Sequence, residues 1–501
     1  MRKRHESQAQ HEPITVAGWR AMLPGLIGLA LVALVLRLAL IPTACKHGYL
    51  WDHDDFVRWG IQATDSGLLT LYTEPPPMQM IRQWNGEDWV AGQRQVARIC
   101  NYPPLSTYLL YGSGLMFRSM HPERLINTGT SRFLFSMWSI LGDLALATGC
   151  AAIVSLYCRR AAVWAMYALM LFLPPIWWDS VIWGQMDSVV LAPLVWCLYF
   201  MMRERWDWAG VFWGVALGLK TLAILFVPVW VVALLLYWKR AWHVLIGIGV
   251  AAGVLLVASL PFTLTSGGAW FTMSYTENLT SAYADRTTMM AFNLWYVDLL
   301  VTDSYDADTL VLGVTKNTWG RVFLLVGLAA GAWWVWSRRQ NNPRTLLLWT
   351  VVSLLAFVML PTRVHERYLL IVLPFLAVAA MLTWRLWPVL LILTVVAMGQ
   401  LTWPIWQFVP GGQSDRIRSS MTRAFSQNEG QPPDPESEAG QRLSQVLQRR
   451  LTVHFQQRAF TTGWEWTFTL LALFGSALTV LALLALPPPG DHAARVSQIE
   501  R

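Results

Sequence analysis

The chain has 501 residues, of which 55% are hydrophobic and only 14% are charged. A water-soluble domain carries about a quarter charged residues, so this composition excludes a soluble globular protein and indicates an integral membrane protein. The net charge of +8 is spread over the loops, and no basic tract with interleaved aromatic residues occurs. This distribution favours anionic lipid headgroups or phosphorylated substrates as partners and argues against nucleic acid.

The polar N-terminal segment 1–20 precedes a long apolar run that begins at Ala21. The run is too long for the hydrophobic part of a signal peptide and lacks a clear cleavage site, so we interpret it as an uncleaved anchor. About 20 apolar residues cross the core of a bilayer. On that basis the sequence predicts twelve spans, over residues 21–42, 131–156, 161–175, 185–202, 208–220, 222–238, 241–262, 319–337, 344–360, 366–384, 386–408 and 463–487.

Short basic turns join the predicted spans on one side of the membrane. They are Arg159-Arg160, Arg203-Glu204-Arg205, Lys239-Arg240, Arg338-Arg339 with Arg344, and Arg385. Basic residues in short loops favour the cytoplasm, so the tails 1–20 and 488–501 are expected inside the cell. Three long segments, 43–130, 263–318 and 409–462, are then expected outside.

The expected fold is an all-α polytopic membrane protein, with a transmembrane module over residues 21–408 and a last helix over 463–487. Within the first outer loop, residues 55–69 and 104–118 have helix-length amphipathic or apolar character. We expect them to form helices that lie along the interface or re-enter it. Another helical segment is expected near 439–458.

Two local patterns in the outer loops are left open. Cys45 and Cys100 fall in the same loop and could form a disulfide if that loop is extracytoplasmic. Asn278-Leu279-Thr280 has the spacing of a glycosylation sequon, a pattern short enough to arise by chance. The five cysteines carry no metal-binding spacing.

Polar residues from six stretches of the chain fall at the outer ends of the predicted spans. They are Asp52-His53-Asp54-Asp55, Asn101-Tyr102-Pro103-Pro104, Asp179 to Asp187, Lys220, Asn293 and Arg363-Val364-His365-Glu366-Arg367. The spans were assigned from apolar runs and basic turns alone, so this agreement points independently to one extracytoplasmic site.

Three carboxylates follow the first span within four residues. Asp52, Asp54 and Asp55 are candidates for a general base, a metal site or hydrogen-bond acceptors for a sugar, because a carboxylate can take a proton from an attacking hydroxyl. The alternative is the solvated start of a loop with no catalytic role.

Cations near two other span ends could hold a phosphate. Arg363, His365 and Arg367 flank the start of the span 366–384, and arginine offers two parallel donors to a phosphate. Lys220 lies in an apolar stretch and needs a partner or a cavity. The alternative for each is a side chain that extends along a helix end to reach water.

The remaining polar candidates are less specific. Asp187 and Asp179 could line a site or cap a helix, since a carboxylate also stabilises a helix N-terminus. Asn293 could contact a substrate or serve only the local structure.

Taken in order, the motifs resemble those of GT-C-type integral-membrane glycosyltransferases, in particular the dolichyl-phosphate-glucose-dependent glucosyltransferases of asparagine-linked glycosylation and their prokaryotic relatives. The resemblance covers about residues 20–385. It rests on Asp52-His53-Asp54-Asp55-Phe56-Val57-Arg58-Trp59, Tyr102-Pro103-Pro104-Leu105, Pro174-Pro175 with Trp183 to Asp187, Lys220, and His365-Glu366-Arg367. It implies a GT-C-like bundle of about 12 transmembrane helices, with a long first extracytoplasmic loop that carries interfacial helices.

The resemblance also implies a reaction. A hexose, glucose or mannose, would move from a polyprenyl-phosphate donor to a hydroxyl of a lipid-linked or cell-envelope glycan, with inversion. Asp52 would be the base, with Asp54 as the second acid and Asp55 beside them. Lys220, His365, Arg367 and Arg363 would balance the phosphate charge. The residues expected to contact substrate are Glu366, Tyr102, Gln185, Asp187 and Asn293.

No metal and no cofactor are expected, since the cations can serve the phosphate. The expected location is the prokaryotic plasma membrane rather than the endoplasmic reticulum. A rival interpretation is a transporter or lipid flippase, although transporters place charged sites near the midplane, often within repeated halves. A second is a glycosyltransferase that acts on protein or on lipid A.

Overall fold

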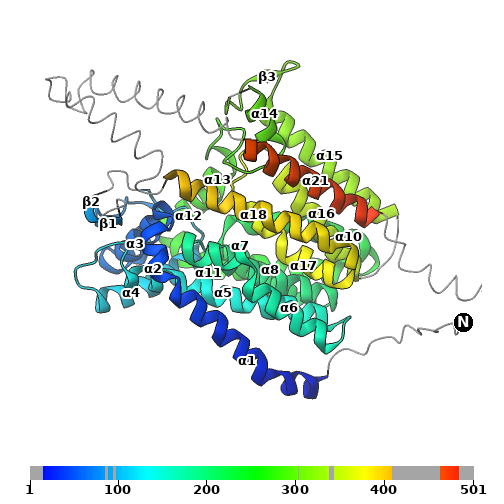
Figure 1. The fold of residues 1–501 in the computed structure, drawn as a ribbon, viewed down its shortest axis with the longest axis horizontal. Helices are drawn as coiled ribbons and strands as arrows, with labels where there is room; N and C mark the ends of the chain where they lie inside the picture. Colours follow the sequence, from blue (N-terminus) through cyan, green and yellow to red (C-terminus); the bar gives the residue numbers. More distant parts are fainter. Residues whose placement is uncertain are drawn as a thin grey trace, which may run out of the picture.

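The computed structural model describes residues 15–84, 88–93, 98–302, 304–337, 343–408 and 463–484. Figure 1 shows that these residues form a body of closely packed helices. Its sheet structure, within the described ranges, is limited to two antiparallel hairpins, β1 (Met80–Trp84) with β2 (Trp89–Gln93) and β3 (Leu310–Val311) with β4 (Val314–Thr315). The tail 488–501, the loop 409–462 and the helix expected near 439–458 lie outside the described residues.

The helical elements follow one another along the chain. The first are α1 (Val16–Ala39), α2 (Ile41–His47), α3 (Leu50–Asp65), the 3₁₀ turn η1 (Leu68–Tyr72), α4 (Pro104–Met120), α5 (Gly129–Ser155) and α6 (Arg160–Phe172). The middle ones are α7 (Pro174–Trp177), the π-helical turn η2 (Trp178–Trp183), α8 (Asp187–Met202), α9 (Trp206–Leu219), η3 (Thr221–Phe226), α10 (Val227–Leu236), η4 (Trp238–Arg240), α11 (Ala241–Ser266), α12 (Ala269–Phe271), η5 (Thr272–Thr276), α13 (Glu277–Thr280) and α14 (Leu294–Thr302). The last are α15 (Lys316–Ser337), α16 (Pro343–Met359), η6 (Tyr368–Ile371), α17 (Leu373–Leu382), η7 (Trp384–Leu386), α18 (Trp387–Phe408) and α21 (Gly463–Leu484).

The protein is a multi-pass integral membrane protein. Among the described residues, six helical segments are long and apolar enough to span a membrane: Ala17–His47, Gly129–Ser155, Trp238–Ser266, Lys316–Ser337, Trp384–Pro404 and Glu465–Leu483. A seventh is the bent pair Arg160–Phe172 and Pro174–Trp183, and four shorter apolar helices are Asp187–Met202, Thr221–Leu236, Arg344–Met359 and Tyr368–Leu382. Each of the twelve predicted spans coincides with a helical segment, but a count of twelve spans is not confirmed because the shorter ones fall below that length.

The bend between α6 and α7 has a cause in the sequence. Pro174 and Pro175 stand at the first positions of α7, where a missing N–H costs nothing but the preceding helix cannot continue. The axis turns there by 42°. The π-helical turn η2 then ends at Gly184, whose φ of 82° is a left-handed conformation that suits glycine.

The two helices predicted in the first outer loop are confirmed as α3 and α4. They lie with α2 and the β1–β2 hairpin at one end of the helical body (Figure 1). An added Cβ at Gly114 would lie 2.2 Å from the Gly60 carbonyl oxygen, so glycine lets the two backbones touch. The helix α3 begins at Leu50, so Asp52 to Asp55 are helical and the alternative of a solvated loop start does not hold.

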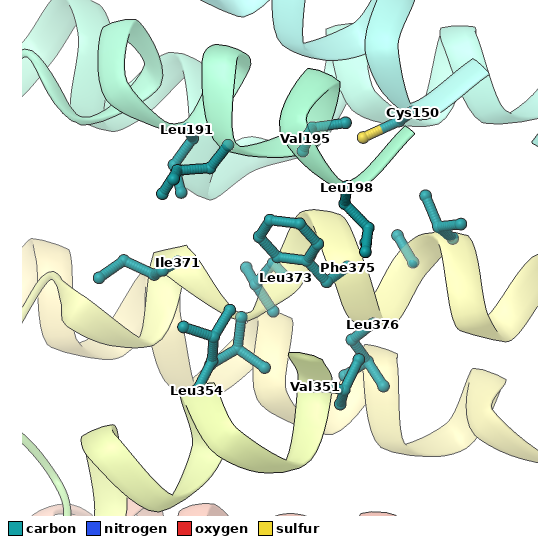
Figure 2. Close-up of a cluster of buried hydrophobic side chains, with 14 of the residues drawn as sticks. Cys150, Leu191, Val195, Leu198, Val351, Leu354, Ile371, Leu373, Phe375 and Leu376 are labelled. Carbon is teal, nitrogen blue, oxygen red and sulfur yellow. The ribbon is translucent and has the colours of Figure 1, made fainter. Parts of the chain in front are cut away.

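The central core lies between helices that are far apart in the sequence. Figure 2 shows the ring of Phe375, from α17, between the side chains of α8 and those of α16. The labelled neighbours are Leu191, Val195 and Leu198 on α8, Val351 and Leu354 on α16, and Cys150 on α5. Because lipid tails are as apolar as these residues, the helices are held by close packing rather than by exclusion of water.

A contact between backbones joins α9 to α11, and it gives a test of this packing. An added Cβ at Gly210 would lie 2.1 Å from the Gly247 carbonyl oxygen, closer than atoms can approach. We expect Gly210→Val to force the helices apart and destabilise the protein by about 1–3 kcal/mol, measured by unfolding in detergent. Gly249→Val is the matched control, because nothing lies within 4 Å of an added Cβ there. Equal losses in both variants would contradict the packing argument.

An ion pair fully buried among the helices joins α1 to α5. The Arg37 Nε lies 2.7 Å from the Asp143 Oδ2, and neither side chain is exposed. Arg37 also donates to the carbonyl of Leu171 at 3.0 Å. Ser180, in η2, donates to the same Asp143 oxygen at 2.7 Å. The pair therefore connects α1, α5, the end of α6 and the π-helical turn.

The two patterns left open in the sequence are answered by the structure. Cys45 and Cys100 both carry free thiols, so the possible disulfide is absent from the described residues. The Asn278 amide is turned inward, where it donates to the carbonyl of Asn101 at 3.0 Å and to that of Ser274 at 2.8 Å. The sequon asparagine thus joins the segment around Asn101 to that around Ser274.

Candidate active site

A pocket of about 970 Å³ opens where the segments 43–130 and 263–318 meet the ends of the helices. Its polar lining includes Asp52, Asp55, Arg98, Tyr102, Lys220, Arg286, Arg321, Arg363, His365, Glu366 and Arg367. One wall is apolar and is formed by Leu222, Ile224 and Leu225 of η3, Leu324 of α15 and Phe357 of α16. The pocket thus joins a charged compartment to a surface that suits a hydrocarbon chain.

Asp52 lies on the first turn of α3 and points into this pocket. Its carboxylate oxygen Oδ2 accepts a hydrogen bond from the Trp183 indole at 2.8 Å and another from the Gln185 amide. The Arg367 Nη1 lies 4.0 Å from the same oxygen, and the Asp52 side chain is 19% exposed. Burial by itself raises the pKa of Asp52, but Arg367, the two hydrogen bonds and Lys220 outweigh it and lower that pKa below its ordinary value. Asp52 is therefore ionised near neutral pH.

The start of α3 is attached to the π-helical turn. The Tyr49 ring stacks on the Trp183 indole with centroids 4.4 Å apart. The Tyr49 backbone N–H donates to the carbonyl of Ile182 at 3.3 Å. The turn therefore fixes both the backbone that carries Asp52 and the carboxylate itself.

Two cations lie behind Asp52 and share one carboxylate. Lys220, at the C-terminal end of α9, makes an ion pair with Asp187 and has its Nζ 3.4 Å from the Gln185 Oε1. The Arg367 Nε lies 3.6 Å from the other Asp187 oxygen. Arg367 also donates to Glu366 at 2.9 Å. A charged network of two cations and three carboxylates therefore surrounds the inner end of the pocket.

The segment that carries Arg367 is held by the long segment 263–318. The Met289 N–H donates to the carbonyl of Val364 at 2.9 Å, and the Glu366 N–H donates to the carbonyl of Met289 at 3.0 Å. Arg363 has a φ of 62°, so the chain turns sharply before this pairing. The His365 ring lies 5.3 Å from that of Tyr283, between centroids, with its Nδ1 3.6 Å from Glu366.

This arrangement offers a base, an anion site and an apolar surface within one cavity. An ionised carboxylate can accept a proton from a hydroxyl, and lysine and arginine can stabilise charge that develops on a phosphate. In the described part of the chain, no group of three His, Cys, Asp or Glu side chains is placed to hold a metal ion. Lys220 and Arg367, which contact the network around Asp52, and His365, which lines the same pocket, are candidates to hold an anion.

Comparison with known proteins identifies the family. The model of "Glycosyltransferase family 87" matches residues 101–361, more than half of the chain. The chain belongs to this family. It is therefore a GT-C-type membrane glycosyltransferase, as the sequence resemblance predicted, and the transporter or flippase interpretation is not adopted.

The chain was also compared with curated protein sequences and with solved structures. No curated protein sequence matches the chain. Among solved structures, the chain is similar to ArnT from Cupriavidus metallidurans, crystallised with undecaprenyl phosphate bound to it, at 16% identity and a TM-score of 0.46. The likeness covers 93% of this chain and 78% of that one.

The structure of this glycosyltransferase brings most of the predicted site residues together. Direct contacts link Asp52, Tyr102, Gln185, Asp187, Lys220, Glu366 and Arg367. Asp55, Arg363 and His365 line the same pocket. Asp52 and the segment from Arg363 to Arg367 lie outside the stretch that the family model matches, so their roles rest on geometry.

Two predicted residues are placed elsewhere. Asp54 points away from the pocket and pairs with Arg58 at 2.8 Å, with both side chains buried. Asn293 donates to the carbonyl of Val358 at 3.2 Å and accepts from the backbone N–H of Trp295 at 3.1 Å. Both serve the local structure rather than the pocket.

Some residues of the pocket had not been singled out in the sequence. Trp183 belongs to a motif of the family resemblance, but nothing in the sequence indicates that its indole donates a hydrogen bond to Asp52. Arg98 reaches the pocket from the segment 43–130 and lies 3.9 Å from Asp55, and Arg286 and Arg321 also line the pocket. A lone arginine in a long outer loop carries no sequence signal of this role.

Proposed function

We propose that this glycosyltransferase moves a hexose, glucose or mannose, from a polyprenyl-phosphate donor to a hydroxyl of a lipid-linked or cell-envelope glycan. The observation that carries the proposal is the single pocket in which the Asp52 carboxylate faces a cavity backed by Lys220 and Arg367 and continued by an apolar wall. A soluble sugar nucleotide would have no use for that wall.

The proposed step is one inverting displacement. The acceptor oxygen attacks the anomeric carbon and gives its proton to Asp52, while the bond from that carbon to the phosphate oxygen breaks and its electron pair stays on the phosphate. Lys220, His365 and Arg367 compensate the added negative charge. Arg363, at the rim of the pocket, extends this basic lining.

The apolar wall gives the donor tail a path. The apolar wall includes Leu222, Leu225, Leu324 and Phe357, and these residues belong to elements with membrane-spanning length or apolar character. An isoprenoid chain between them would leave the sugar phosphate beside Lys220 and the tail in lipid. The pocket would then receive its donor laterally from the membrane.

The proposed side of the membrane follows from the basic turns. Arg159-Arg160 and Lys239-Arg240 join helices in short turns, and such turns favour the cytoplasm. Residues of the long loops contribute much of the pocket lining, so we propose that the pocket opens outside the cell. A prokaryotic plasma membrane is the proposed location.

The proposal can be tested with purified protein in lipid nanodiscs. The protein is incubated with extracted membrane lipids and with radiolabelled polyprenyl-phosphate glucose or mannose. We expect label in a lipid-linked or glycan product with one of the two donors, and none with the matching nucleotide sugar. Transfer from the nucleotide sugar alone would overturn the donor class. Label in protein or in lipid A would overturn the acceptor class and favour the second interpretation above.

A further inference from the structure

We propose that Gln185 is a positioning residue, which fixes the Asp52 carboxylate so that only its Oδ1 faces the acceptor. The neutral amide of Gln185 also connects that carboxylate to Lys220. The inference rests on the proposed role of Asp52 as the base. It gives Gln185 a role different from the substrate contact that the sequence predicted.

The contacts of Gln185 leave its amide one orientation. Its Nε2 donates to the Asp52 Oδ2. Its Oε1 accepts from the Tyr102 hydroxyl at 3.0 Å, from the Lys220 Nζ at 3.4 Å and from the Met186 backbone N–H at 3.3 Å. Only donors face the oxygen and a carboxylate faces the nitrogen, and Gln185 is 1% exposed. A buried amide with this many partners cannot rotate without losing several hydrogen bonds.

The two oxygens of Asp52 are used unequally. Among the described residues, the hydrogen bonds from Trp183 and Gln185 and the approach of Arg367 are all made to Oδ2. Oδ1 is therefore left for a ligand in the pocket that Asp52 lines. Two donors on one oxygen hold the plane of the carboxylate, which is the geometric requirement for a proton transfer.

The backbone that carries Gln185 is also fixed. Its carbonyl accepts from the Ser139 hydroxyl of α5 at 2.5 Å. The N–H groups of Gly184 and Gln185 both donate to the carbonyl of Asp179 at 3.0 Å. The turn that carries Gln185 is thus anchored to α5, so α5 helps to fix the orientation of the Asp52 carboxylate.

The neutrality of the amide has a consequence that can be measured. The charged and titratable groups around Asp52 are Arg367, Lys220, Arg98, Asp55, Asp187, Glu366, Tyr49 and Tyr102. Replacing the amide by a carboxylate of the same shape puts a second negative charge against Oδ2. Like charges raise each other's pKa, so Asp52 would take up a proton at a higher pH.

The test compares Gln185→Glu, Gln185→Leu and the wild type, with kcat, the KM for the donor and the pH profile of kcat/KM as readouts. Because the pKa of Asp52 is lowered, wild-type activity should fall only below the ordinary aspartate pKa of about 4. We expect the activity of Gln185→Glu to fall already below neutral pH. We expect Gln185→Leu to lose about 10²-fold in kcat with little change in KM, since a misplaced base slows chemistry more than binding.

The matched control is Gln62→Leu. Gln62 is equally buried on α3, but its Nε2 donates to the carbonyl of Glu74 at 3.0 Å, away from the pocket. Its pH profile should follow that of the wild type. An unchanged acid limb in Gln185→Glu, which keeps the shape of the wild-type side chain, would overturn the inference even if Gln185→Leu fails to fold.

The outcome is separable from that of the proposed function. If Asp52→Asn is inactive while both Gln185 variants keep the wild-type kcat and pH profile, the inference fails and the base assignment stands. If Asp52→Asn keeps full activity, the base assignment itself fails.

Discussion

An Asp52→Asn variant is expected to lose about 10²–10⁴-fold of its transfer rate, the range that a positioned general base contributes. Asparagine keeps the volume of the side chain, and its oxygen can still accept from the Trp183 indole, now 2.8 Å from Oδ2. What disappears is an oxygen that can take up a proton. Transfer of radiolabel from the donor lipid measures the loss, and a separate binding assay with unlabelled donor should show retained affinity.

The control for this variant lies on the same helix. Asp65, at the last turn of α3, is partly exposed and pairs with Arg118 at 3.6 Å. Asp65→Asn should leave the transfer rate within about twofold, since surface pairs contribute little. Full activity of Asp52→Asn would contradict the proposed mechanism. In the wild type the rate should fall only in strong acid, because the lowered pKa of Asp52 keeps the base ionised until the pH drops through it.

An Arg37→Leu variant is expected to lose about 3–5 kcal/mol of stability, because it leaves Asp143 buried without its partner. The Asp143 side chain has no exposed surface, and besides Arg37 it accepts from Ser180 at 2.7 Å. A charge cannot reach water from there. Thermal or SDS-induced unfolding in detergent measures the change.

Two comparisons sharpen this prediction. The double variant Arg37→Leu with Asp143→Leu should recover most of the loss, since a buried ion pair is often replaced by apolar residues at little cost. Arg240→Leu removes an exposed partner of Glu204, 3.3 Å away, and should cost less than about 1 kcal/mol. A double variant no more stable than Arg37→Leu would show that the pair stabilises the fold by more than mutual neutralisation.

The positions of the apolar helices could be predicted from the sequence, because a helix that crosses the hydrocarbon core of a bilayer needs a long run of apolar residues. The break at Lys220 could be predicted as well, because the predicted spans 208–220 and 222–238 meet there, as α9 and the 3₁₀ turn η3 do. The partner of Lys220 could not be predicted, because Asp187 lies 33 residues away and outside any local window.

The site could be predicted as a set of segments but not as a set of contacts. Arg58 stands four residues after Asp54, a helical spacing that could have shown that this acid pairs within α3. The same spacing argument was not available for Asp52, whose partners are 131, 133 and more than 300 residues away. Tertiary packing decides that Asp52 and Asp55 line the cavity while Asp54 does not.

The Asp187 carboxylate between Lys220 and Arg367 bears on turnover. An incoming donor meets two cations that already share an internal anion, so the protein competes with the phosphate for its own charges. The spent carrier phosphate, a monoester, is more negative than the donor phosphodiester, so two unpaired cations would hold it tightly. Under the proposed function, Asp187 weakens that hold and so helps the spent carrier lipid to leave the pocket for the bilayer.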